Sequence, residues 1–142
     1  MFYNLLKKRV LVSGDPSSFI LRIQKDVLER QLFSLHSLYV GIKRNWASGT
    51  QVLFVRRDMF TGSGVIHKII AIDQLQEDER KLCLENNWYA KISFAKVVLF
   101  EPAVSVQDTP ISGQNPLMLH GANISRRELL EIEGLAPSKI IL

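Results

Sequence analysis

The segment GIKRNWASGTQVLF, residues 41–54, concentrates side chains that can do chemistry on a polyanion. Lys43 and Arg44 carry positive charge that neutralises phosphate groups, and Asn45 offers an amide that hydrogen-bonds the edges of bases. Trp46 offers a flat ring on which an unstacked base lies, an interaction that contributes about 1–3 kcal/mol per base. A second interpretation is also open: Trp46 packs into the interior and the charges are solvated.

Other basic and aromatic residues extend this candidate site. Arg56 and Arg57 end the next apolar stretch, and strand alternation turns only one of the two away from the core, so Arg57 joins the candidates. The basic triplet Lys7–Arg9 extends the same charged track. Trp88 and Tyr89 open a later apolar stretch, where core packing accounts for at least one of them. The predicted ligand-binding residues are therefore Lys43, Arg44, Asn45, Trp46 and Arg57.

Motifs for catalysis and cofactor binding are missing from the sequence. It contains no GxxxxGK[ST], GxGxxG, GxSxG or HExxH pattern. Its three histidines, His36, His67 and His120, lie far apart and beside no carboxylate at metal-ligand spacing. The single cysteine, Cys83, excludes an internal disulfide. We expect no cofactor and no metal, and the sequence identifies no catalytic residue.

Composition predicts one globular domain. A chain of 142 residues has the size of a single domain, and its apolar fraction of 46% and charged fraction of 23% are ordinary for a soluble protein. No apolar run approaches the roughly 20 residues of a membrane span, and the N-terminal stretch lacks the long apolar segment and cleavage site of a signal peptide. We expect residues 1–142 to form one domain in the cytoplasm, with no membrane partner.

Positive charge is concentrated in the first half of the chain. Residues 1–72 hold 11 Lys and Arg against 4 Asp and Glu, whereas residues 73–142 hold 7 against 10. This asymmetry, in a protein of net charge +4, indicates a polyanionic partner. Aromatic and amide residues lie among the charges, and no helix has a densely basic face. Both features favour RNA or single-stranded nucleic acid over duplex DNA.

Three helices are expected around these residues. Asp15–Pro16 fits the N-cap and first position of an amphipathic helix over residues 16–33, with its apolar face at Ile20, Ile23, Val27 and Leu28 and its polar face at Arg22, Lys25, Asp26, Glu29 and Arg30. A pair that resembles a capping box, Asp73 and Gln76, starts a helix through QEDERKLCLEN, and the acidic run Glu77–Glu79 suits the positive end of its dipole. A true capping-box signature at Ser125 starts the third helix, near the end of the chain.

Short β-prone stretches separated by Gly, Asn and Ser are expected to form one sheet. A hairpin is expected across DMFTGSG, because its glycines can take positive φ, and Pro102 marks the edge or end of the last long strand. The fold class is α+β: a small, mixed, mostly antiparallel β-barrel or strongly bent sheet of five to six strands, with about three peripheral helices. The expected strands cover residues 10–12, 37–42, 50–57, 65–72 and 88–102.

The run KRNWASGTQVLFVRRDMFTGSGVI resembles the central signature of PUA-like domains, especially those of the EVE type. In that signature an Arg-Asn pair precedes a turn, a VLF-type strand, and a return through a glycine to the next strand. The chain's wider layout is also similar to a small archaeal family of uncharacterised proteins in the same superfamily. The matching positions are Arg44–Asn45 for the pair, Gly49–Thr50 for the turn, Val52–Phe54 for the strand and Gly64 for the return.

The resemblance implies a compact, barrel-like fold whose relatives include PUA, ASCH, YTH and EVE domains, many of which bind RNA or enclose a modified base. It therefore implies a non-catalytic module that binds RNA or a modified nucleobase. An ASCH-like hydrolase acting on a nucleobase or nucleoside derivative is an alternative, in which Lys43 acts with Thr50 or Glu101. Gly41 and Lys43 fit the ASCH pattern, but Trp46 stands where that pattern has Glu. A protein-interaction module is a third possibility.

Overall fold

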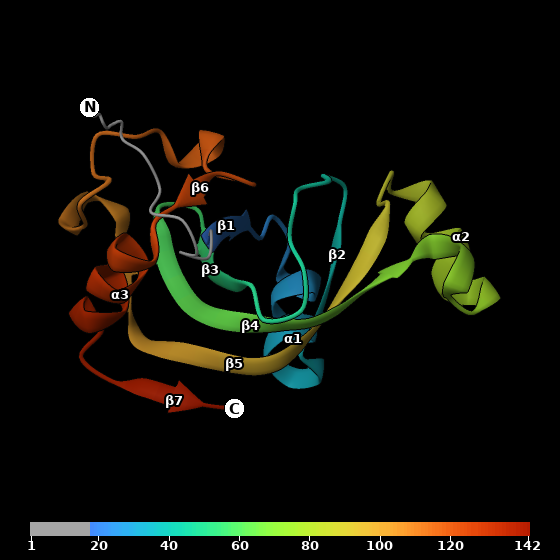
Figure 1. The fold of residues 1–142 in the computed structure, drawn as a ribbon, viewed down its shortest axis with the longest axis horizontal. Helices are drawn as coiled ribbons and strands as arrows, with labels where there is room; N and C mark the ends of the chain where they lie inside the picture. The colour runs from blue at the N-terminus through green and yellow to red at the C-terminus, as the bar shows by residue number, and fades with distance from the viewer. Residues whose placement is uncertain (1–17) are drawn as a thin grey trace.

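Residues 18–142 are described by a computed structural model, drawn in Figure 1. The strand expected over residues 10–12, the helix start expected at Asp15–Pro16 and the basic triplet Lys7–Arg9 lie outside these residues. The helices are α1 (Asp26–Leu35), α2 (Glu77–Glu85) and α3 (Arg126–Leu135), and short 3₁₀ turns cover Ile72–Gln74, Val106–Asp108 and Pro116–Met118. The strands are β1 (Ser18–Arg22), β2 (Ser37–Val40), β3 (Gln51–Arg56), β4 (Met59–Ala71), β5 (Ala90–Ser105), β6 (Asn123–Ile124) and β7 (Lys139–Ile141).

One mixed sheet joins all seven strands of the described residues, in the order β2-β5-β4-β3-β1-β6, with β7 paired to β5. β1 and β3 run parallel, and the other pairs are antiparallel. The end strands β2 and β6 do not pair with each other, so the sheet is open, although β4 and β5 bend strongly (Figure 1). The expected α+β class with three helices is confirmed. In place of a closed barrel of five to six strands, the protein has an open sheet of seven.

Two glycines in β4 let aromatic rings lie directly on the sheet. A Cβ on Gly62 would lie 2.2 Å from a carbonyl oxygen of β5 and 3.2 Å from the ring of Phe33. A Cβ on Gly64 would lie 3.0 Å from the ring of Phe54. Phe54 makes edge-to-face contacts with Phe33 and Phe94, with ring centroids 6.3 and 5.3 Å apart. The absence of a side chain at both glycines is therefore a packing requirement of the core.

The hairpin expected across DMFTGSG is wrong in position. Most of these residues belong to β4, and the chain reverses earlier, at Arg57 and Asp58, between the paired residues Arg56 and Met59. Arg57 takes a φ of 56°, which is uncommon for a residue other than glycine. The glycines that suggested a turn are instead needed beneath the aromatic rings.

Within the helix expected over residues 16–33, the described residues, from Ser18 on, form a strand followed by a shorter helix. β1 is buried on both faces and pairs with β3 on one side and β6 on the other. Its apolar run Phe19–Leu21 therefore does not alternate, and with the apolar residues that follow it mimics helical spacing. α1 begins only at Asp26. It buries Leu28, whereas Val27, expected on the apolar face, is 55% exposed.

The other two helices lie close to expectation. α2 begins at Glu77, and its first turn carries the expected acidic residues; Asp73 lies in the preceding 3₁₀ turn and does not cap it. α3 starts with the expected capping box. Its Ser125 hydroxyl accepts from the Glu128 N–H, and the Glu128 carboxylate accepts from the Ser125 N–H, both at 3.0 Å.

β5 continues past Pro102, which was expected to mark its edge or end. Leu99 pairs with Gly62 of β4 and Val104 pairs with Phe60, so the register shifts between them and Pro102 lies in the stretch without a β4 partner. Proline donates no hydrogen bond to a ladder, and at such an irregularity none is needed.

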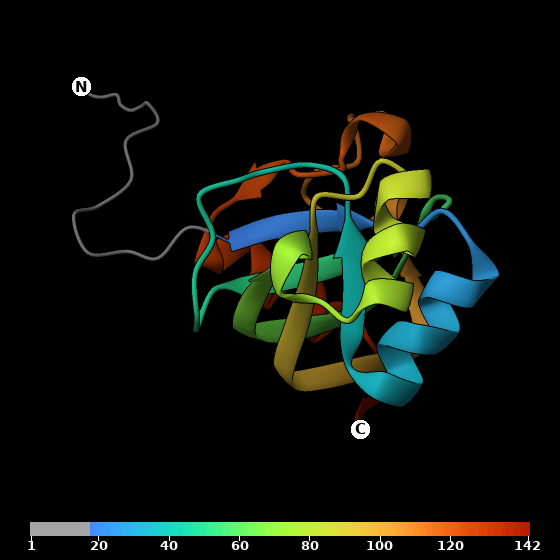
Figure 2. The same cartoon turned by 90° about the vertical axis from the view of Figure 1, so that its right-hand side faces the viewer.

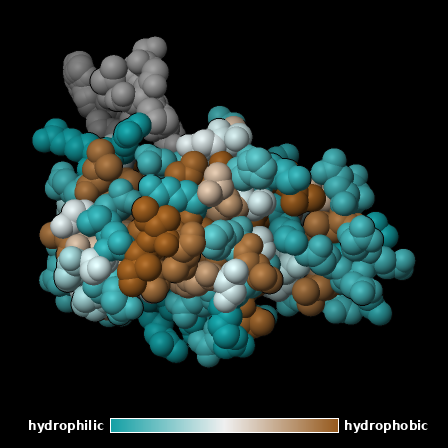
Figure 3. Space-filling view, turned by 90° about the horizontal axis from the view of Figure 1, so that it is seen from below, coloured by the Kyte–Doolittle hydropathy of each residue, from teal (hydrophilic) through white to brown (hydrophobic). Residues whose placement is uncertain are grey.

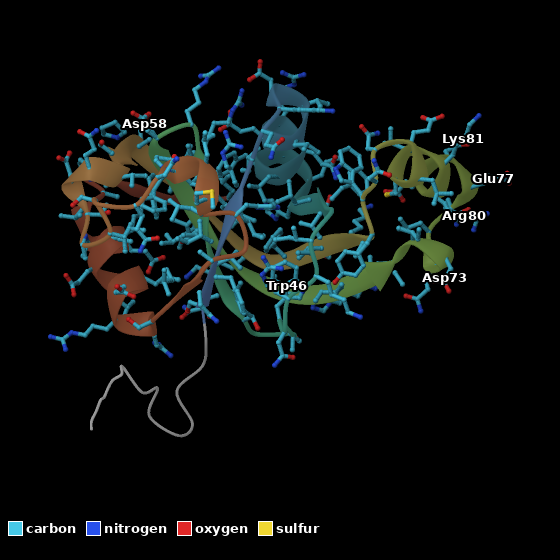
Figure 4. The ribbon with its side chains drawn as sticks, turned by 90° about the horizontal axis from the view of Figure 1, so that it is seen from above. Trp46, Asp58, Asp73, Glu77, Arg80 and Lys81 are labelled. Carbon is cyan, nitrogen blue, oxygen red and sulfur yellow. The ribbon has the colours of Figure 1, made fainter. Side chains whose placement is uncertain are left out.

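The outer surface has two further features. The connection between β4 and β5 contains α2, which lies at one end of the molecule with Glu77, Arg80 and Lys81 toward the outside (Figure 4). On the underside, exposed apolar residues gather over β7 and the chain end, where Ile141 is 69% exposed (Figure 3).

No helix among residues 18–142 is both long and apolar enough to cross a membrane.

Replacing Gly62 by alanine tests the close approach of β4 to β5. The added methyl group overlaps a β5 carbonyl oxygen, so we expect the free energy of unfolding to fall by about 1–3 kcal/mol or more. Gly134→Ala is the control, because its site has open space and lies in α3, where alanine is favoured over glycine by up to about 1 kcal/mol. Urea unfolding measures both variants. Wild-type stability of Gly62→Ala would contradict the packing described.

Candidate functional site

Trp46, the residue expected to stack on a base, lies in the core. It is 6% exposed and meets the ring of Phe19 edge to face, with centroids 5.6 Å apart. It belongs to the same apolar cluster as Leu21 and Val52. Its ring therefore has no open face for a ligand, and the packing interpretation of this residue is the one observed. Its indole N–H is buried and has no acceptor among the described residues.

Lys43, Arg44 and Asn45 are exposed on the loop between β2 and β3. Arg44 Nε donates to the carbonyl oxygen of Gly121 at 3.1 Å, and one terminal nitrogen donates to the carbonyl oxygen of Lys43 at 2.9 Å. Gly121 has a φ of 78°, and a Cβ there would lie 2.8 Å from the guanidinium, so this contact requires glycine. Gly49, with a φ of 90°, makes the expected turn at the end of the loop.

Arg57 does not join this loop. It lies in the turn between β3 and β4, and the length of β3 separates it from the loop that ends at Gln51. Figure 4 shows the separation, because Trp46 and Asp58, the neighbour of Arg57, lie well apart. The predicted set of five residues is therefore not one surface.

A pocket opens where the end of β1 meets β2 and the connection from α2 to β5; Figure 2 looks onto β2 with α1 and α2 beside it. The pocket volume is about 280 Å³, close to the lower end of the range for small-molecule sites, roughly 300 Å³. Residues of β2 supply an apolar wall, and the polar side chains come from three separate segments. They are Arg22, Gln24 and Lys25 around the end of β1, Asn86 and Asn87 after α2, and His120 before β6.

A hydrogen bond to the backbone holds His120 in this pocket. The N–H of Arg22 donates to Nδ1 of His120 at 2.8 Å. Because a nitrogen that accepts carries no proton, the neutral ring holds its proton on Nε2, which becomes a donor. Burial, together with the positive charges of Arg44 and Arg22, holds the pKa of His120 below its ordinary value of 6.5. At neutral pH His120 is therefore an uncharged hydrogen-bond donor.

Trp88 forms the aromatic wall of the pocket. Its ring is stacked on that of Tyr39, with centroids 4.9 Å apart and planes 10° from parallel, and the Lys25 ammonium lies 5.9 Å from its centroid. A hydrogen bond fixes the position of Tyr39: its hydroxyl donates to the carboxylate of Glu79, which also accepts from Lys91 at 2.7 Å. Hydrogen bonds from Lys91 and Tyr39 hold the pKa of Glu79 below its ordinary value, so its carboxylate stays ionised and keeps both donors.

The pocket is positively charged, and its lining contains no carboxylate. Arg22 and Lys25 line it, and Arg44 is bonded to the residue that follows His120. None of the three makes an ion pair among residues 18–142, whereas Arg56, elsewhere, is paired with two carboxylates. Arg22 Nε is also buried without an acceptor in that part of the chain. The site is therefore suited to an anionic, oxygen-rich ligand.

The arrangement expected for a hydrolase is not formed around Lys43. Lys43 is exposed, the Thr50 hydroxyl accepts from the N–H of Ala47, and Glu101 lines a separate depression. Cys83 is buried, and burial raises the pKa of its thiol. The described residues contain no group of three or more His, Cys, Asp or Glu that could hold a metal ion.

Sequence reasoning missed the residues that line the pocket. The periodicity puts Arg22 and Lys25 on the outer face of a helix, core packing accounts for Trp88, and His120 is an isolated histidine. Arg22 and His120 are 98 residues apart in the sequence, and the order of the strands in the sheet brings them together. A local signal did exist in residues 86–88, where two amides and an indole are consecutive.

Comparison with known proteins finds no relative of this chain. No protein-family model, no curated protein and no solved structure matches the chain. The functional interpretation therefore rests on the pocket and its residues.

The two tryptophans give different predictions for stability. Trp46→Ala removes a buried ring and should lower the free energy of unfolding by about 3–5 kcal/mol. Trp88→Ala removes a partly exposed ring and should lower the free energy of unfolding by less than half of that amount. Urea unfolding at neutral pH compares the variants. If Trp46→Ala is as stable as the wild type, Trp46 is not a core residue and this description of the loop is wrong.

Mild acidification should destabilise the protein through His120. Its pKa is lowered in the folded state, so the unfolded chain binds the proton more readily, and stability is lost as the pH falls below 6.5 towards the folded-state pKa. Protonation also removes the acceptor for the Arg22 N–H and adds a charge beside Arg22 and Arg44. His120→Gln should flatten this dependence, whereas His67→Gln, at an exposed site, should not. Urea midpoints across this pH range measure it; identical slopes for all three proteins would refute the assignment.

Proposed function

We propose that the protein is a non-catalytic cytoplasmic module that binds RNA or another single-stranded nucleic acid, with one base, modified or unmodified, in the pocket of Arg22, Trp88 and His120. The observation that carries this proposal is the composition of the lining. It combines two cations, three side-chain amides and the aromatic rings of Tyr39 and Trp88, with no carboxylate.

Each part of a nucleotide has a chemical counterpart in this lining. Tyr39 is stacked on one face of Trp88, so a base stacks on the other face in place of the Lys25 ammonium. The amides of Gln24, Asn86 and Asn87 both donate and accept, as the edge of a base requires. The Nε2–H of His120 adds a donor. A base must leave its stack to enter a pocket of this size, and a base in a duplex must also break its pairing, which favours single strands over duplexes.

The surrounding loop has a revised part in this proposal. Lys43 and Arg44 contact phosphates at the rim, and Asn45 contacts a flanking nucleotide. Trp46 supports the loop from the core through Phe19 and does not touch the ligand. Arg57 lies outside the site.

A relation to PUA-like domains, among EVE, ASCH and YTH relatives, remains part of the proposal. A strongly bent, mostly antiparallel sheet with a pocket at one end is compatible with it. The turn at Gly49 has the backbone role that the resemblance implies, whereas Gly64, matched there to the return, lies inside β4. The open sheet is then a variation on the barrel of those domains.

Binding of a fluorescent, mixed-sequence single-stranded RNA tests the proposed function. We expect Trp88→Ala to weaken binding by about 5–150-fold, because stacking contributes about 1–3 kcal/mol per base. Affinity should also fall steeply as salt is raised. Phe33→Ala is the control, since it removes a partly buried ring from a separate depression. Fluorescence anisotropy measures all three proteins. Equal affinities, or no binding at low salt, would contradict the proposal.

A further inference from the structure

We propose that a phosphate subsite lies at the rim of the pocket, formed by the guanidinium groups of Arg22 and Arg44 beside His120, so that the ligand is held as a nucleotide and not as a bare base. The nature of the nucleotide rests on the proposed function. The phosphate subsite itself can be tested without it.

Two hydrogen bonds attach the backbone of Arg22 and the side chain of Arg44 to His120 and the residue after it. The Arg22 N–H donates to Nδ1 of His120 at 2.8 Å, and Arg44 Nε donates to the carbonyl oxygen of Gly121 at 3.1 Å. Arg22 and Arg44 are therefore both anchored to the consecutive residues 120 and 121. Both guanidinium charges are close enough to act on the His120 ring, where they oppose its protonation.

Donors in this cluster lack protein acceptors. Arg22 Nε is buried and has none among the described residues. Nε2–H of His120 is a second donor, because Nδ1 is occupied by the Arg22 N–H. The bonds of Arg44 use its Nε and one terminal nitrogen, which leaves its second terminal nitrogen without a partner in residues 18–142.

A phosphate group matches this set of donors. Its oxygens are anionic and accept several hydrogen bonds, and the planar guanidinium fork fits them in a bidentate manner. Neither arginine is paired with a carboxylate in the described part of the chain, so an anion has no internal competitor there. The phosphate can be a phosphodiester within a strand or the terminal phosphate of a mononucleotide, and the chemistry of the subsite is the same for both.

The first experiment titrates the full-length protein with inorganic phosphate, against chloride at constant ionic strength, and follows the ¹⁵N signals of arginine and histidine side chains. We expect saturable shifts at Arg22 Nε and His120 with phosphate only. Arg22→Gln should weaken phosphate binding by about tenfold or more, and Arg22→Lys should restore only part, because lysine keeps the charge but not the fork. Arg126→Gln is the control, since it removes one exposed charge from α3, on the opposite side from β2 (Figure 1).

Arg44→Gln, at an exposed residue, provides the same comparison if Arg22→Gln does not fold. Shifts that are spread over the surface, or that fall equally in Arg126→Gln, mean that phosphate binds through net charge alone. Either result overturns the subsite.

The second experiment separates the two sources of phosphate. An RNA that binds more tightly than its methylphosphonate-linked analogue, with the difference lost in Arg22→Gln, assigns the subsite to a phosphodiester. A mononucleotide that binds more tightly than its nucleoside, with the same loss, assigns it to a terminal phosphate. RNA binding that is unchanged in Arg22→Gln and Arg44→Gln overturns the subsite but leaves the proposed function standing. Phosphate shifts at Arg22 without RNA binding keep the subsite and overturn the proposed function.

Discussion

Most of this structure follows from the need to satisfy the backbone of β1. A strand buried on both faces has no water for its N–H and C=O groups, so each needs a protein partner. β3 lies along one side. On the other side, the Ile20 N–H donates to the carbonyl oxygen of Ala122 and the Ile20 carbonyl accepts from Gly121. At Arg22 the acceptor on that side is a side chain, Nδ1 of His120. The end of β1 thus determines which nitrogen of His120 carries the proton.

The same strand separates the residues that pack in the core from those that line the pocket. Phe19 in β1 packs against Trp46, so the ring that was expected to stack on a base instead supports the loop from the core. Beyond Arg22 the chain leaves the sheet to start α1, and the stacked pair of Trp88 and Tyr39 borders the space beside it. The pocket is therefore a consequence of where β1 ends, and its positive charge comes from residues at that end.

The sequence predicts features that one segment decides by itself. The capping box at Ser125 is of this kind, because Ser125 and Glu128 supply both of its hydrogen bonds, and the turn at Gly49 is closed locally by the bond from the Thr50 N–H to the carbonyl oxygen of Ala47. β1 was missed because a strand with two buried faces has no alternation to recognise. Gly62 was misassigned because its role depends on rings and a strand that are distant in sequence. Trp46 and Trp88 both follow polar residues, so only their tertiary neighbours distinguish a core ring from a ring that lines a pocket.

The central claim, that the ligand enters the pocket at the end of β1, is tested most directly by the indole ¹⁵N–¹H signals of the protein. The chain has two tryptophans, one in the pocket and one in the core, so the spectrum contains both a probe and its internal control. On titration with a single-stranded RNA, the Trp88 signal should shift and saturate while the Trp46 signal stays in place. A shift of Trp46 with no change at Trp88 would place the ligand on the β2–β3 loop instead and contradict this account.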